Sequence, residues 1–295
     1  MSLETETSVH LLALASRLEG EGHINLAKLC YATADSLSRR AAYQIVIPSA
    51  RDELVAEIER TIDALSRLNV DKNLLVAFQR GATAFAQGRL AMFSETPHPY
   101  VCRTCGHLTV GEPIEKCPSC GAWASTYQRF LPVYWLDAFE PFAALETLKQ
   151  TPIQVAELLR GLSEDALNRP ADDGSWAIRN IVAHLRDAQG VIGFLVDLFL
   201  KDEKPVLESK AVFAWATNES ERPPLTREIF ETYKTARAEM IAKLENLPLA
   251  RWWRVAQHEE FGPVTLRQQV SYFAAHELTH LSQIESLRRR AGSQG

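Results

Sequence analysis

The sequence predicts an all-α protein with a small cysteine-rich module between two helical parts. Apolar residues recur at intervals of three and four along most of the 295 residues, which is the period of a helix with one buried face. Two Cys-x2-Cys pairs and closely spaced prolines interrupt this pattern near the middle of the chain. We therefore expect an N-terminal helical region over 1–95, a cysteine module over 96–125 and a helical bundle over 126–295.

The N-terminal region is predicted to form three or four helices, with breaks near 20–22, 47–49 and 69–71, where glycine, proline or polar residues interrupt the periodicity. Cys30 lies in an apolar helical stretch and is expected to be a small buried residue. The acidic and histidine side chains of 19–23 are expected at a helix end or loop, without a ligand role.

The C-terminal region is predicted to hold four long helices, which is the number that makes a bundle. Their expected ranges are 138–161, 175–200, 226–246 and 265–290. Ser175 and Thr265 are candidate N-caps for the second and fourth of these helices. Thr265 also has Gln268 three residues later, so we expect a capping box there.

The composition and charge of the chain argue against several classes of partner and location. The formal net charge is −5, and basic residues are scattered except for Arg288-Arg289-Arg290 at the end of the last predicted helix. That cluster suits the negative end of a helix dipole, so no nucleic-acid partner is expected. The sequence has no run of about 18 apolar residues, and its first residues are acidic and polar. We therefore expect neither a membrane span nor a signal peptide, and a cytoplasmic protein.

Four of the five cysteines form a candidate metal site. Cys102, Cys105, Cys117 and Cys120 make two Cys-x2-Cys-Gly knuckles, which in a reducing compartment indicate metal binding instead of disulfides. Four thiolates suit Zn²⁺ or a single iron. His107 is expected to be a solvated turn residue.

The run YVCRTCG followed by KCPSCGAW resembles the rubredoxin-like module of rubrerythrins over residues 98–124. This resemblance implies one iron and electron transfer, whereas zinc ribbons with the same knuckles use the metal structurally. Both metals remain open, because both accept four sulfur ligands. The di-iron site of rubrerythrins is not expected, since the N-terminal helices contain no Glu-x-x-His.

A second candidate metal site lies in the last region. His276 and His280 are four residues apart, so they share one face of a helix and can point at one ion. His184 lies within an apolar stripe on the second predicted bundle helix and is the best candidate for a third ligand. Three neutral imidazoles leave a coordination position open, as in catalytic sites, and suit a divalent ion such as Zn²⁺ or Ni²⁺.

The segments GSWAIRNIVAHLRDA and AAHELTHLSQIESLR resemble the DinB-like four-helix bundle family, over about residues 138–295. In that family one histidine of the second helix and two of the fourth bind a divalent ion, which by motif position are His184, His276 and His280. The resemblance also implies a homodimer, and activation of a low-molecular-weight thiol, since its members include thiol-dependent S-transferases and an isomerase.

Three neighbours of these histidines have expected roles. Asp187 lies near His184 and either accepts an imidazole N–H or is a surface acid. Gln283 is expected to line the site. Glu277 is about 100° around the helix from His276, so we expect a solvated residue and not a general base.

The sequence thus favours a metal-dependent enzyme that uses the three histidines for thiol-dependent transfer or hydrolysis of a small electrophile, an S-transferase or a hydrolase. No catalytic side chain beyond the metal ligands is assigned. The alternative is a metal- or redox-responsive binding or electron-transfer protein with a rubredoxin-like iron site.

Overall fold

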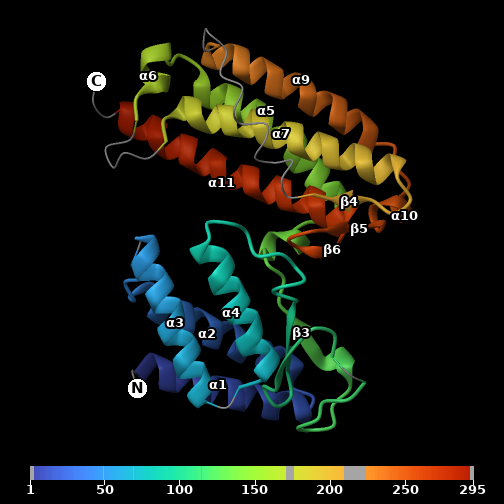
Figure 1. Ribbon diagram of the computed structural model, residues 1–295. Coiled ribbons are helices and arrows are strands. Elements are labelled where there is room, and N and C mark those ends of the chain that lie inside the picture. Colours follow the sequence, from blue (N-terminus) through green and yellow to red (C-terminus); the bar gives the residue numbers. More distant parts are fainter. Residues whose placement is uncertain are drawn as a thin grey trace. The chain divides into compact units, whose positions relative to one another are not determined.

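The computed structural model describes residues 3–48, 50–68, 70–113, 115–170, 176–208 and 224–292. The chain forms two compact units (Figure 1). The first comprises Met1–Ala91 and Pro99–Arg129, and the second comprises Met92–His98 and Phe130–Gly295. None of the helices in the described part of the chain combines the length and apolarity needed to cross a membrane.

The first unit contains four helices, as the periodicity predicts: α1 (Leu3–Gly20), α2 (Ile24–Tyr43), α3 (Arg51–Arg67) and α4 (Lys72–Ala86). Small side chains let α1 and α2 pack closely, and Cys30 is buried there at 6% exposure beside Ala15 and Ala27. The expectation for Cys30 is therefore confirmed. Asp71 caps α4 by accepting the backbone N–H groups of Asn73 and Leu74.

The cysteine module of the first unit contains a small antiparallel sheet. Strands β1 (Pro99–Cys102), β2 (Leu108–Val110) and β3 (Tyr127–Arg129) form it in the order β2-β1-β3, and a short 3-10 turn, η1 (Ala124–Thr126), precedes β3. The first knuckle begins at the end of β1, and an isolated bridge between Lys116 and Trp123 flanks the second. The strands are too short to show an alternating pattern in the sequence.

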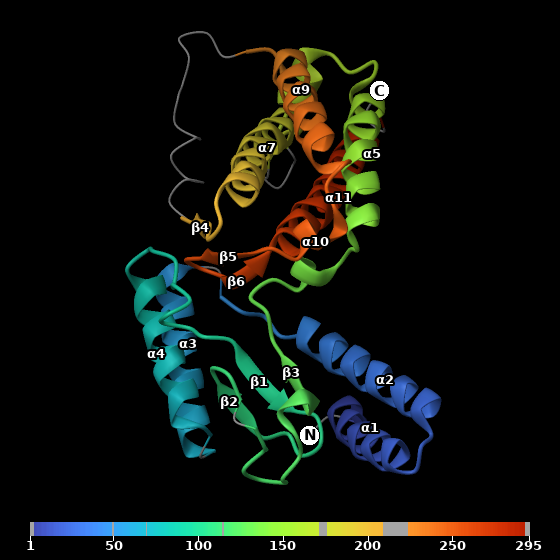
Figure 2. The ribbon, with the colours of Figure 1, turned by 90° about the vertical axis from the view of Figure 1, so that its right-hand side faces the viewer.

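The described residues of the second unit form four long helices: α5 (Pro141–Leu159), α7 (Ile178–Lys201), α9 (Thr226–Leu244) and α11 (Leu266–Gly292). Each lies within three residues of its predicted bounds. They pack as a ring, in which α5 contacts α11 and α9, and α7 contacts α9 and α11 (Figure 2). Their apolar faces meet in two clusters of buried residues that fill the interior of the bundle.

Short elements complete this unit: η2 (Tyr134–Asp137), α6 (Glu164–Asn168), α10 (Leu249–Trp252), β4 (Val206–Leu207), β5 (Val255–His258) and β6 (Gly262–Thr265). Strand β5 pairs with β4 in parallel and with β6 antiparallel. The protein is therefore mostly helical but not purely all-α, and that part of the prediction is wrong. These strands are two to four residues long, and their pairing depends on partners distant in the sequence.

Of the two predicted helix N-caps, the structure describes only the one at Thr265. The capping box at α11 is confirmed, because the Thr265 Oγ1 accepts the N–H of Gln268 at 3.1 Å while the Gln268 Oε1 accepts the N–H of Thr265 at 2.8 Å. Ser175 lies outside the described residues. At α7 the side chain of Asn180 instead accepts the N–H of Ala177 at 3.1 Å.

The turn between β5 and β6 requires a glycine. Gly262 has φ +72°, and a Cβ there would lie 2.7 Å from the ring of Phe93. We expect Gly262→Ala to lower the free energy of unfolding by about 1–3 kcal/mol, through backbone strain and steric overlap. Gly193→Ala is the control, since it lies inside helix α7 with the nearest atom at 3.8 Å. It should raise stability by about 0.5–1 kcal/mol in the same denaturant titration.

Candidate metal centres

Helices α7 and α11 bring the three predicted histidines together. His276 and His280 lie one turn apart on α11, and His184 faces them from α7. The Nε2 atom of His276 is 3.2 Å from that of His184 and 3.0 Å from that of His280. The fold thus brings His184 together with two histidines that follow it by 92 and 96 positions in the chain, as the sequence analysis expects.

The spacing of the three nitrogens fits a common ion. A tetrahedral ion with metal–nitrogen distances of about 2.0–2.1 Å separates its nitrogen ligands by about 3.3 Å. The observed Nε2 separations of 3.0 and 3.2 Å are close to this value. Neutral imidazole nitrogens are also the donors that Zn²⁺ and Ni²⁺ accept readily.

Aromatic rings surround the histidine cluster. Trp176, just before α7, stacks on His280 with an interplanar angle of 14° and lies 5.2 Å from the ring of His184. Tyr272 stacks on His276, and Trp135 meets the same imidazole edge-on at 6.4 Å. These rings limit the rotation of the imidazoles and remove water from part of the cluster.

Burial keeps two of the imidazoles neutral. It is the largest of the effects that lower the pKa of His276 to about 4, and the nearby His280 and His184 act in the same direction. Burial and His280 likewise lower the pKa of His184, against a smaller opposing effect of Asp187. The neutral imidazole is the form that binds metals.

The neighbours of the cluster differ from one another in role. Gln283 confirms its expected place, since its Oε1 lies 2.8 Å from the Nδ1 of His280. A proton on that Nδ1 leaves the Nε2 lone pair directed at the cluster. The carboxylate of Asp187 instead accepts a hydrogen bond at 2.8 Å from the adjacent Arg186, and no imidazole N–H of the described residues donates to it.

Glu277 corrects the sequence prediction. We expected a solvated residue, but its side chain is fully buried. Arg237 of α9 binds it with both terminal nitrogens, and the hydroxyl of Tyr233 donates to it at 3.2 Å. The helical angle correctly placed Glu277 off the histidine face, but that other face meets α9 instead of water.

The four cysteines also converge in the first unit. Cys102 lies 3.7 Å from Cys120, and Cys105 lies 3.7 Å from Cys117, as measured between Sγ atoms. A tetrahedral ion with metal–sulfur distances of about 2.3 Å separates its ligands by about 3.8 Å. Cys102 and Cys117 are buried, while Cys105 and Cys120 are exposed.

Neighbouring groups favour the thiolate at two of the four cysteines, because the pKa of Cys102 and of Cys117 is lowered, whereas that of Cys105 and of Cys120 is raised. Gly106 and Gly121 follow the two knuckles with φ +77° and +75°, a conformation that glycine adopts without strain. At Cys117 burial favours the thiol, but hydrogen bonds from Tyr127 and from the backbone N–H groups of Cys120 and Ser119 outweigh it. They lower the pKa of Cys117 to about 6. His107 lies 3.1 Å from the hydroxyl of Ser119, in agreement with a turn residue.

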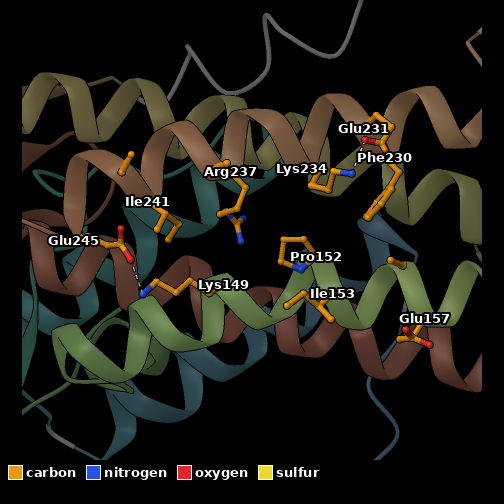
Figure 3. A pocket seen from close by; sticks show the side chains of 13 residues that line it. Lys149, Pro152, Ile153, Glu157, Phe230, Glu231, Lys234, Arg237, Ile241 and Glu245 are labelled. Atoms are coloured by element: carbon orange, nitrogen blue, oxygen red, sulfur yellow. Dashed lines mark ion pairs between the residues drawn. The ribbon is translucent and has the colours of Figure 1, made fainter.

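The bundle also has a pocket of about 660 Å³ between α5 and α9 (Figure 3). Pro152 and Ile153 of α5 and Phe230 and Ile241 of α9 give it apolar walls, and Arg237 reaches into it from α9. The lysines at its edge are engaged in ion pairs: Lys149 with Glu146 and Glu245, and Lys234 with Glu231.

The fold and its clusters define a helical-bundle protein with three convergent imidazoles, joined to a four-cysteine module. The sequence of the bundle is similar to that of a known protein family. Residues 147–284, which include all three histidines, match the family model described as the DinB superfamily. The second unit is thus similar in sequence to the DinB superfamily.

Individual relatives are distant. YuaE of Bacillus subtilis is 24% identical over 144 residues, covering 45% of this chain and 89% of YuaE. The protein named "Putative metal-dependent hydrolase YfiT", also from B. subtilis, is 22% identical over 149 residues, covering 50% and 84%. The solved structure of YfiT, whose title describes an unusual four-helix bundle topology, aligns with a TM-score of 0.47 and 20% identity, covering 55% of this chain and 94% of YfiT.

Sequence reasoning missed Arg237 and Trp135. Arg237 falls on the same helical face as Tyr233 and Met240, which are buried at 0% and 2% exposure. A charged residue at a core position of an amphipathic pattern was the signal that a buried partner had to exist. No sequence pattern could place Trp135 beside the histidines, because η2 contacts α11 only in the folded chain.

The lowered pKa of His276 predicts an acid-sensitive, metal-free protein. Between the ordinary histidine pKa of about 6.5 and the folded value of about 4, the unfolded chain binds a proton at this residue that the folded chain does not. The free energy of unfolding should therefore fall as the pH drops through this window. Chemical denaturation of protein treated with a chelator measures it.

His276→Gln should reduce that pH dependence, because the side chain no longer titrates. His10→Ala is the control, since His10 is exposed on α1. An equal slope of stability against pH in the wild type and in His276→Gln would contradict the assignment.

Proposed function

We propose that the chain is a metal-dependent enzyme in which His184, His276 and His280 hold a divalent ion, Zn²⁺ or Ni²⁺, for hydrolysis or thiol-dependent transfer of a small electrophile. The observation that carries the proposal is the convergence of three imidazoles from two helices, with the Nε2 of His276 at 3.2 Å from that of His184 and 3.0 Å from that of His280. The match of residues 147–284 to the DinB superfamily and the hydrolase names of several relatives support it.

The ligand set favours catalysis over a structural role. Three nitrogens leave at least one coordination position for a substrate or water. An ion held there would act as a Lewis acid toward water, a thiol or a carbonyl group. Trp176 lies beside the cluster and is half exposed, so this edge of the histidine cluster is close to solvent.

The chain's own residues orient this site. Gln283 holds His280 in the tautomer that presents Nε2, and the stacked ring of Trp176 holds its plane. Glu277 is not available as a general base, since Arg237 occupies both of its oxygens. We therefore assign activation of the nucleophile to the metal position and not to a carboxylate of α11.

The cysteine module is proposed to bind Zn²⁺ or iron through Cys102, Cys105, Cys117 and Cys120. The Sγ separations of 3.7 Å support a common ion. Iron there would favour the second candidate function, a redox-responsive or electron-transfer protein, because the two exposed thiolates give an electron partner access to the site. Zinc would favour a structural module beside an enzymatic bundle.

The expected partners follow from this proposal. They are a small-molecule substrate, a low-molecular-weight thiol in the case of transfer, and a second copy of the chain in a homodimer. A cytoplasmic location belongs to the same proposal, because free thiolates and a thiol cosubstrate require a reducing compartment.

Substitution of one histidine tests the enzyme directly. His276→Gln should abolish binding of Ni²⁺ or Zn²⁺ at the bundle, measured by calorimetry with the cysteine site already saturated with zinc. Hydrolysis of an activated ester or amide, and transfer of glutathione, bacillithiol or mycothiol to a generic electrophile, should fall by at least about 100-fold. His107→Gln is the control, and metal binding or activity that survives in His276→Gln would refute the proposal.

The metal of the cysteine module is identified by elemental analysis of protein purified without added metal. With zinc bound, Cys117→Ser should release about one metal ion per chain and lower the melting temperature of the first unit. Cys30→Ser is a matched control, because Cys30 is buried outside the site. Visible thiolate-to-iron absorbance that disappears in Cys117→Ser would instead support the electron-transfer function.

A further inference from the structure

We propose that Arg237 is a positioning residue for the histidine site, through contacts that fix both helices that carry the histidines. This inference rests on the proposed function. Arg237 lies on α9, which contributes none of the three histidines, and its side chain is only 2% exposed. Figure 3 shows it leaving α9 and entering the space between α9 and α5.

Arg237 binds all three of the other long helices. It binds both oxygens of Glu277 on α11, with Nη1 2.9 Å from Oε2. Its Nε donates to the Oε1 of Gln189 on α7 at 2.6 Å. Its Nη1 also donates to the carbonyl of Leu148 on α5 at 2.9 Å. One guanidinium thus sets the distance and rotation of three helices relative to α9.

The contact with α5 is built into the sequence. Pro152 lies inside α5 and has no N–H, so the carbonyl of Leu148 four residues earlier lacks its helical donor. Arg237 supplies a donor to this carbonyl. The guanidinium is therefore held at a fixed position along the bundle axis by the carbonyl of Leu148 as well as by the carboxylate of Glu277.

The other two contacts lie close to the histidines along each helix. Glu277 directly follows His276 and precedes His280 by three residues, so its position fixes the rotation of that turn of α11. Gln189 follows His184 by five residues on α7. A metal site tolerates displacements of only a few tenths of an ångström in its ligands, so both helices must be held accurately.

A bidentate pair suits this role better than apolar packing does. A buried ion pair contributes little net stability, because removing both charges from water offsets their attraction. Its forked geometry nevertheless accepts a narrow range of orientations, whereas apolar side chains slide over one another. The main role of this pair is therefore to align the histidines, and its contribution to the stability of the bundle is small.

The decisive experiment replaces the whole pair. Arg237→Met combined with Glu277→Leu removes both charges and fills the space, but it leaves the carbonyl of Leu148 and the Oε1 of Gln189 without their donor, so the variant should stay folded with a modestly lower melting temperature. The affinity of the histidine site for Ni²⁺, measured with the cysteine site saturated with zinc, should fall by about 10- to 100-fold. The ligand-field spectrum of bound Co²⁺ should change, because the ligands are no longer held in one geometry.

Two further variants keep the test decisive. Gln189→Met removes only the contact with α7, and should weaken Ni²⁺ binding in the same direction even if the double variant fails to fold. Lys243→Met removes an exposed ion pair between the same helices, with Asp197 of α7, and should leave the Ni²⁺ affinity unchanged.

The outcomes separate this inference from the proposed function. If the wild type binds no metal at the histidines, the proposed function fails and the inference fails with it. If the wild type binds Ni²⁺, and the folded double variant or Gln189→Met binds it with equal affinity and an unchanged Co²⁺ spectrum, then only the positioning role of Arg237 is overturned.

Discussion

The alignment of the helices in the second unit is set by one buried cation that four helices share. Arg237 has nearly no exposed surface, and it is satisfied by a carboxylate, an amide and a helix carbonyl that each come from a different helix. A buried guanidinium without such partners would be strongly unfavourable, so the helices must arrive in one arrangement for the bundle to form. The same arrangement brings the imidazoles of α7 and α11 together.

The two candidate metal centres differ in the chemistry that their ligands permit. The cysteine module offers four sulfurs at nearly tetrahedral spacing, which fill the coordination sphere of zinc or of a single iron. The bundle offers three nitrogens, which would leave at least one coordination position of a bound ion unfilled. The first unit therefore suits a structural or electron-transfer role, whereas the second suits a reaction at the metal.

Local pattern predicted much of this protein. The four long helices of the bundle lie within three residues of their expected ranges, because each has an apolar stripe of helical period and a recognisable end. The pair His276 and His280 and the two cysteine knuckles were also predictable, since ligand spacing within one helix or one knuckle is a local property, whereas His184 comes from another helix and was assigned with the help of the family resemblance. Strands β4, β5 and β6 were missed, because they are short and their partners lie far apart in the chain.

The sequence by itself determined which side chains could bind metal: paired cysteines beside glycines, and histidines one helical turn apart. Only the tertiary structure decided what surrounds them. Glu277 has the spacing of a surface residue, and it is buried because α9 presents Arg237 to that face of α11. Periodicity specifies the angle at which a side chain leaves its helix, but whether water or another helix lies at that angle depends on packing between distant segments.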